Sequence, residues 1–348
     1  MSPKIRLLLL LLGGACLAAG VAGGLARLGL PIPATGSAAF HGALMTSGFL
    51  GTVISLERAV ALGSRWAYLA PLASGLGTIL PLAGVHAGIV LWFIAPLLLL
   101  GVSLALIRRQ CQPHIVLLAV AAGAWAVGNA IFATRLGSAA PAWWFTFLVL
   151  TIAAERLELT RLMPRSNGAA PLFAQAAGLL VVGAIASLAD DTWGRVLFGA
   201  GLLAVAAWLA AYDVARRTVR MPGFARYAAV ALLGGYAWLA VAGVAWAFAP
   251  GQRDIALHAL GMGFVFSMIF AHAPVIVPVV LKRRVAFSRL AYVPLALLHL
   301  SLLVRFAGGA ADATLRAAGG VLNACAVALF VAVVAFSAAA HGSGKVLR

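Results

Sequence analysis

The stretch GIVLWFIAPLLLLGVSLALI, residues 88–107, contains no charged side chain and is closed by Arg108 and Arg109. A helix rises about 1.5 Å per residue, so roughly 20 apolar residues are needed to cross the hydrocarbon core of a membrane. The stretch is therefore predicted to form a transmembrane helix.

The composition extends this prediction to the whole chain. Of its 348 residues 64% are apolar and 9% charged, and the mean hydropathy is +1.06, which excludes a water-soluble globular protein. We predict an all-α polytopic membrane protein with about twelve transmembrane helices in a single integral domain, residues 1–348. The predicted spans are 5–24, 38–62, 66–86, 88–107, 115–134, 141–162, 171–188, 194–212, 226–248, 256–281, 287–307 and 315–337.

The basic residues predict the orientation. With an even number of spans and both termini in the cytoplasm, most of the 25 Lys and Arg residues fall on the inner side, as expected for short cytoplasmic loops. The exceptions are Arg27, Arg135, Arg195, Arg253, Arg305 and Arg316. This predicts a multi-pass protein of a bacterial-type inner membrane, in contact with the lipid bilayer. The net charge of +17 is then a topology signal, and no nucleic-acid partner is expected.

Two predicted spans have a histidine near their outer end with a methionine four residues later: His41 with Met45, and His258 with Met262. Neutral imidazole is a common iron ligand, and facing helices hold haem through axial histidines. We interpret His41 and His258 as ligands of one haem b. Ordinary packing of small-residue helices around two hydrogen-bonded histidines is the alternative. Met45 and Met262 are either alternative ligands or packing residues.

Further along the tenth span, His272 lies about four turns beyond His258, too far to share its iron. It precedes Pro274, which frees a backbone carbonyl. His272 is expected either to donate to that carbonyl or to bind a second metal with His299. Arg305 and Arg316 flank the last loop, where they would pair with haem propionates or extend to the membrane interface.

Carboxylates gather near the predicted inner boundary. Unpaired charge is costly at this depth, so pairing with an arginine of another helix is expected; a proton entrance from the cytoplasm is the alternative. The carboxylates are Glu57, Glu155 and Glu158, and the candidate partners are Arg58, Arg156 and Arg161.

The helix count, the two histidines and the arginine beside the last loop resemble subunit I of haem–copper oxidases and nitric oxide reductases. They resemble more closely the haem-containing NnrS-like proteins of nitric oxide metabolism. The resemblance implies three arcs of four helices and a low-spin haem held by His41 and His258. It also implies nitric oxide or another small gas as ligand, and quinol or another electron donor.

One departure from the oxidases concerns copper. The sixth span carries Trp143, Trp144 and Phe145, and residues 141–188 contain no histidine to supply the oxidases' copper ligands. Oxygen reduction at a haem–copper centre is therefore not expected, and whether the protein is another kind of oxidoreductase is left open. Copper or another second metal would have His272 and His299 as its remaining ligands.

Two other classes of protein fit the same sequence. A secondary transporter would use a broken tenth helix and a midplane site around His272, His299 and Pro274. A subunit without its own chemistry is the third reading. Histidines paired near the outer surface favour haem, whereas a site around His272 favours transport.

Overall fold

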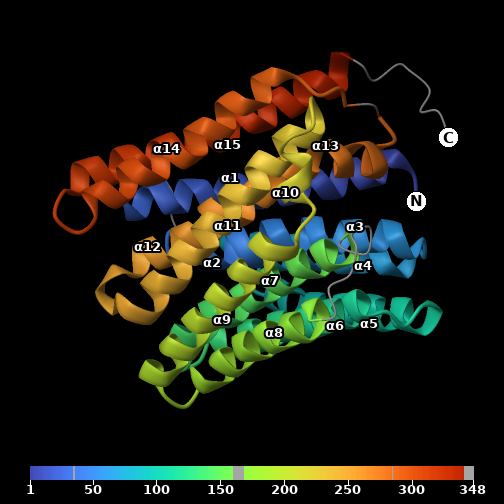
Figure 1. Cartoon of the computed structure of the whole chain (residues 1–348). Coiled ribbons are helices and arrows are strands. Elements are labelled where there is room, and N and C mark those ends of the chain that lie inside the picture. The colour runs from blue at the N-terminus through green and yellow to red at the C-terminus, as the bar shows by residue number, and fades with distance from the viewer. Residues whose placement is uncertain (34–35, 160–167, 284, 341–348) are drawn as a thin grey trace. The chain divides into compact units, whose positions relative to one another are not determined.

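The computed structural model describes residues 1–33, 36–159, 168–283 and 285–340, and within these ranges the chain is helical with no strand (Figure 1). Lipid offers no hydrogen-bond partners, so a chain this apolar satisfies its backbone within helices. The predicted all-α polytopic membrane protein is confirmed.

In the described residues ten helical segments are long and apolar enough to span a membrane. They are Pro3–Arg27 (α1), Gly88–Arg109 (α5), Pro113–Phe132 (α6), Gly137–Leu159 (η3 and α7), Ala169–Ala186 (α8), Asp191–Tyr212 (α9), Phe224–Phe248 (α11), Pro250–Leu281 (η5, α12, η6 and α13), Arg289–Gly308 (η7 and α14) and Ala313–Ala340 (α15). Each coincides with one of the twelve predicted spans.

The other two predicted spans are also helical but shorter or less apolar. The 38–62 span consists of α2 (His41–Ala43), the π-helix η1 (Leu44–Gly51) and α3 (Thr52–Leu62), and it contains Glu57 and Arg58. The 66–86 span consists of η2 (Trp66–Tyr68) and α4 (Leu69–Leu82). The described residues thus contain a helical segment at every predicted position.

The chain divides into two compact units. Unit 1 comprises Met1–Phe147 and Ile276–Lys282; unit 2 comprises Leu148–Val275 and Arg283–Arg348, within the described residues. Two of the three unit boundaries fall inside α7 (Ala140–Leu159) and α13 (Ser267–Leu281), and the third follows Lys282. The three four-helix arcs stay a prediction.

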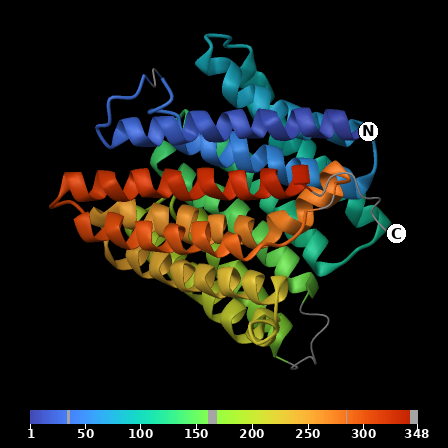
Figure 2. The same ribbon diagram turned by 90° about the horizontal axis from the view of Figure 1, so that it is seen from above.

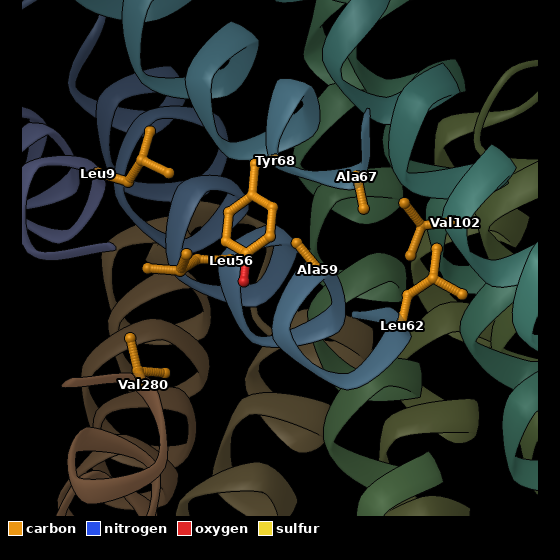
Figure 3. Packing of buried hydrophobic residues seen from close by; sticks show 8 residues of the cluster. All are labelled: Leu9, Leu56, Ala59, Leu62, Ala67, Tyr68, Val102 and Val280. Atoms are coloured by element: carbon orange, nitrogen blue, oxygen red, sulfur yellow. The ribbon is translucent and has the colours of Figure 1, made fainter. Parts of the chain in front are cut away.

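A buried cluster in unit 1 joins helices that are distant in sequence (Figure 3). Arg6 of α1 donates from Nη1 to the Val280 carbonyl oxygen, 3.3 Å away, and its guanidinium lies over the Tyr68 ring. The cluster consists of Leu9, Leu56, Ala59, Leu62, Ala67, Tyr68, Val102 and Val280. It packs the first three helical segments and α5 against the end of α13.

In unit 2 glycines bring helices into backbone contact. A Cβ atom built on Gly183 of α8 would lie 2.3 Å from the Phe198 backbone nitrogen of α9. A Cβ atom on Gly319 of α15 would lie 2.5 Å from the Arg305 backbone of α14. Figures 1 and 2 show α14 and α15 side by side. Since lipid is as apolar as leucine, such close van der Waals packing holds membrane helices together.

Candidate functional site

His41 begins α2 and rests on two glycines of α1. Its Nδ1 lies 2.7 Å from the Gly20 carbonyl oxygen. A carbonyl oxygen can only accept, so Nδ1 carries the proton. A Cβ atom on Gly24 would lie 2.8 Å from the His41 Cε1, so the ring lies directly on the α1 backbone. Gly20 and Gly24 share a helix face because they are four residues apart. Together they fix the ring's position and tautomer.

Met45, one turn after His41, packs against the same face of α1. A Cβ atom on Gly20 would lie 2.7 Å from the Met45 sulfur, so the absence of a side chain makes room for the thioether. This contact favours the packing interpretation of Met45.

A buried polar network holds η1, the π-helix that follows His41. Ser47 of η1 donates to the Asn129 Oδ1 of α6 at 2.9 Å and accepts from the Trp125 Nε1 at 2.9 Å. Ser74 of α4 donates to the Ser47 carbonyl oxygen at 2.5 Å. Ser47, Ser74 and Asn129 are fully buried. Three neighbouring side chains therefore fix this one residue of the π-helix.

Asn129 is the centre of that network. Its Oδ1 accepts a second hydrogen bond from the Trp144 Nε1 at 2.9 Å, and its Nδ2 donates to the Trp92 carbonyl oxygen at 2.9 Å. Trp144, predicted to stand where oxidases place a copper ligand, is thus a hydrogen-bond donor in this neutral network. A satisfied buried network of this kind rigidifies the helices that contribute to it.

His258 ends α12 (Arg253–His258), and Asp254 holds its ring. The His258 Nδ1 lies 2.9 Å from the Asp254 carbonyl oxygen and 3.2 Å from the Asp254 Oδ1. Arg305 of α14 binds the same carboxylate through both oxygens, at 2.8 Å from Nε and 2.6 Å from Nη2. Such bidentate pairs fix geometry as well as charge.

Arg305 is buried, and its guanidinium pairs with Asp254. Its pairing with a haem propionate stays a prediction. The Nε of Arg316 is buried and has no hydrogen-bond partner among the described residues.

The second π-helix, η6 (Ala259–Phe266), directly follows His258. A Cβ atom on its Gly263 would lie 2.5 Å from the Trp238 Cγ of α11. The Trp238 Nε1 donates to the His299 Nδ1 of α14 at 2.8 Å. His299 Nδ1 is therefore an acceptor, and in the neutral ring Nε2 carries the proton. π-helical turns often occur at functional sites, and here both lie immediately beside a candidate ligand.

His272, on α13, belongs to a buried charged cluster. Arg156 of α7 pairs with Asp213 at 2.7 Å, and its Nη1 lies 3.1 Å from the His272 Nε2. The exposed fractions are 4% for Arg156 and 0% for Asp213. Tyr236 of α11 is buried and faces the same pair. We call Arg156, Asp213, Tyr236 and His272 the Arg156 cluster.

One expectation about His272 is corrected. Its Nδ1 lies 2.7 Å from the Met268 carbonyl oxygen rather than at the Phe270 carbonyl that Pro274 would release. The helix α13 continues through Pro274 to Leu281, and the transporter reading stays a prediction. His272 and His299 have separate partners, and the described ranges contain no group of three or more His, Cys, Asp or Glu that could hold a metal ion.

Among the inner carboxylates, Glu57 pairs with the adjacent Arg58 at 2.5 Å, and Arg156 pairs with Asp213. Cross-helix pairing of Glu57, Glu155 and Glu158 stays a prediction. Arg161 lies outside the described residues. Glu155 is half-buried and Glu158 exposed at the end of α7. The proton entrance stays a prediction.

Sequence reasoning missed three residues that organise these sites: Asn129, Asp213 and Asp254. Asp254 was detectable because it precedes His258 by four residues, a spacing that brings helical side chains together. Asn129 and Asp213 carried the weaker signal of a polar residue within or beside an apolar run.

No curated protein and no solved structure matches this sequence. A family model described as a domain of unknown function, DUF8744, matches residues 6–339, nearly the whole chain and both histidine sites. The chain therefore belongs to the DUF8744 family.

Proposed function

We propose that this protein binds haem b in the membrane through His41 and His258, and that it binds or processes nitric oxide or another small gas, or transfers electrons. The observation that carries the proposal is shared by both histidines. Each directs Nδ1 to a backbone carbonyl oxygen, of Gly20 at 2.7 Å and of Asp254 at 2.9 Å. Histidine ligands of metals characteristically use one ring nitrogen in this way, which assigns coordination to Nε2.

The donor set fits a low-spin haem. Two neutral imidazoles would supply two axial ligands, and both come from predicted spans rich in glycine and alanine. The pairing on one iron rests on the predicted outer location of both histidines. Bound haem would supply an iron that changes oxidation state by one electron and binds diatomic gases.

The proposal includes the location and the electron donor. The distribution of Lys and Arg favours an inner, cytoplasmic membrane with both termini in the cytoplasm. Quinol or another small donor would supply electrons. His272 and His299 do not enter the proposal as ligands of a second metal, because the first contacts Arg156 and the second Trp238.

The test is an ultraviolet–visible spectrum of the detergent-purified protein, oxidised and then reduced with dithionite. We expect a Soret band, with sharp α and β bands on reduction. His41→Ala and His258→Ala should each abolish haem retention. His86→Ala is the matched control, because its exposed ring also contacts a backbone carbonyl oxygen, that of Gly84 at 2.8 Å.

Two results would overturn the proposal. One is a colourless protein purified from cells supplied with haem; the other is full haem retention in both ligand variants. Size-exclusion elution of each variant separates loss of haem from loss of fold.

A secondary transporter is the second candidate, and the Arg156 cluster favours it. Buried ionisable groups near the ends of membrane helices are costly and often mark a transport pathway. A colourless protein whose His272→Ala variant keeps its fold but loses uptake of a solute in proteoliposomes would support this alternative.

A further inference from the structure

The His258 Nδ1 faces two oxygen atoms of one residue. It contacts the Asp254 carbonyl oxygen at 2.9 Å and lies 3.2 Å from the Asp254 carboxylate. Asp254 therefore places a negative charge beside one of the two candidate ligands.

The Asp254 carboxylate is held in place from its other side. Arg305 binds both of its oxygens, and the exposed fraction of the Arg305 side chain is 7%. Because Asp254 is four residues before His258 on α12, the helix itself sets the spacing of the carboxylate and the imidazole. Asp254 is thus fixed between a cation and the imidazole, not mobile at a helix end.

We infer that Asp254 is a positioning residue that raises the basicity of the His258 ring nitrogen that would coordinate iron, and that Arg305 limits the strength of this effect. A carboxylate that accepts from the distal N–H of a ligating imidazole raises the basicity of the coordinating nitrogen. A more basic ligand favours ferric over ferrous iron. This inference rests on the proposed haem ligation and adds how the protein sets the reduction potential of that site.

The experiment is a reductive titration of the haem-loaded, full-length protein, followed by its absorption spectrum. Asp254→Asn keeps the shape of the side chain and removes its charge. We expect the ferrous-to-ferric ratio at a fixed potential to rise about tenfold, equivalent to about 59 mV for a one-electron couple.

The matched control is Asp191→Asn, which removes the same charge from an aspartate that also contacts the residue four positions later. Asp191 pairs with Arg195 at 2.9 Å, and its exposed fraction is 80%. The control should leave the potential unchanged. An unchanged potential in Asp254→Asn with haem retained, or an equal shift in Asp191→Asn, would overturn the inference.

Arg305→Gln should shift the reduction potential in the opposite direction. It also tests the Asp254–His258 contact if Asp254→Asn loses its haem. It leaves the carboxylate without its guanidinium partner, so His258 should become more basic and the potential should fall. An unchanged potential in this variant contradicts the role of Asp254.

A second readout does not depend on haem. In haem-free protein with nitrogen-15-labelled histidine, Asp254→Asn should move the His258 imidazole resonance, and Asp191→Asn should not. An unmoved resonance overturns the inference even if the wild-type protein binds no haem. Absence of haem in the wild-type protein, with the resonance shift present, contradicts the proposed function and leaves the Asp254–His258 contact supported.

Discussion

The two π-helices use the same backbone geometry but different supporting chemistry. In unit 1, Gly51 of η1 lies against Trp125, whose indole donates to Ser47. In unit 2, Gly263 of η6 lies against Trp238, whose indole donates to His299. Each π-helix follows a candidate ligand histidine.

The two π-helices differ in the polar groups that surround these tryptophan contacts. The network of η1 converges on the neutral amide of Asn129. The segment containing η6 is held by ion pairs near both ends: Asp254 with Arg305, and Arg156 with Asp213 beside His272. The same π-helical backbone geometry is therefore stabilised by different kinds of side-chain contact in the two units. The support of η1 centres on a neutral amide, whereas ion pairs lie near both ends of the segment that contains η6.

The largest effect is expected for Asp213→Ala. It leaves the buried Arg156 guanidinium without its carboxylate and removes the hydrogen bond from the Ala215 backbone N–H. The free energy of unfolding should fall by about 3–5 kcal/mol. Reversible unfolding in mixed detergent micelles, followed by circular dichroism, measures it.

Two further variants show what causes the loss of stability in Asp213→Ala. Asp213→Asn keeps a hydrogen-bond acceptor but removes the charge. The part of the decrease in the free energy of unfolding that both variants show is therefore due to loss of the charge. Asn129→Ala, the counterpart in the neutral network, should lower the free energy of unfolding by about 1–3 kcal/mol. Equal losses for Asp213→Ala and Asn129→Ala would contradict this prediction and show that the charged and neutral supports are energetically equivalent.

The next effect concerns the tryptophan contacts of the two π-helices. An alanine Cβ atom at Gly51 would lie 2.5 Å from Trp125, and one at Gly263 would lie 2.5 Å from Trp238. Each Gly→Ala change should lower the free energy of unfolding by about 1–3 kcal/mol, because the indole must move. The same unfolding assay applies.

Each unit offers a matched control. Gly123 in unit 1 and Gly178 in unit 2 have nothing within 4 Å of a built Cβ atom. Alanine there should be neutral or stabilise the helix by up to about 1 kcal/mol. If Gly51→Ala or Gly263→Ala behaves like its control, that π-helix is not held by its tryptophan.

A third prediction tests the support of His41 alone. Gly24→Ala places a methyl group 2.8 Å from the His41 ring and should displace it, whereas Gly14→Ala on the same helix meets nothing within 4 Å. Under the haem proposal, Gly24→Ala should weaken haem binding about tenfold, as for other residues that orient metal ligands. Haem retained per protein during competition with apomyoglobin is the measurement; equal retention in both variants refutes the role of Gly24.

The smallest effect is expected for single indole hydrogen bonds. Trp144→Phe and Trp238→Phe each remove one N–H donor, and hydrogen bonds between membrane helices average about 0.6 kcal/mol. Trp238→Phe should cost more, because the Asn129 Oδ1 still accepts from Ser47 after Trp144→Phe. The reverse order in the free energies of unfolding would indicate that the Asn129 network fails as a unit.

Sequence reasoning reached the helices and two of the histidines but not the contacts that support them. All twelve predicted spans contain helices, and both histidines identified from sequence have Nδ1 at a backbone carbonyl oxygen, a feature shared by His86 and His272. The glycine cradle of His41, the π-helical turns and the tryptophan contacts were not predicted. Each depends on how one helix is aligned along its neighbour, and no local sequence pattern predicts that alignment.

The sequence by itself determined the helices and their approximate ends, because a run such as residues 88–107 has no alternative way to satisfy its backbone in lipid. Only the tertiary structure decided which polar groups meet: Arg156 with Asp213, 57 residues away, and Asp254 with Arg305, 51 residues away. A water-soluble helix reveals its buried face by an apolar stripe. These helices are apolar on all sides, so hydrophobicity does not distinguish the face that will be buried. Packing against neighbouring helices selects that face.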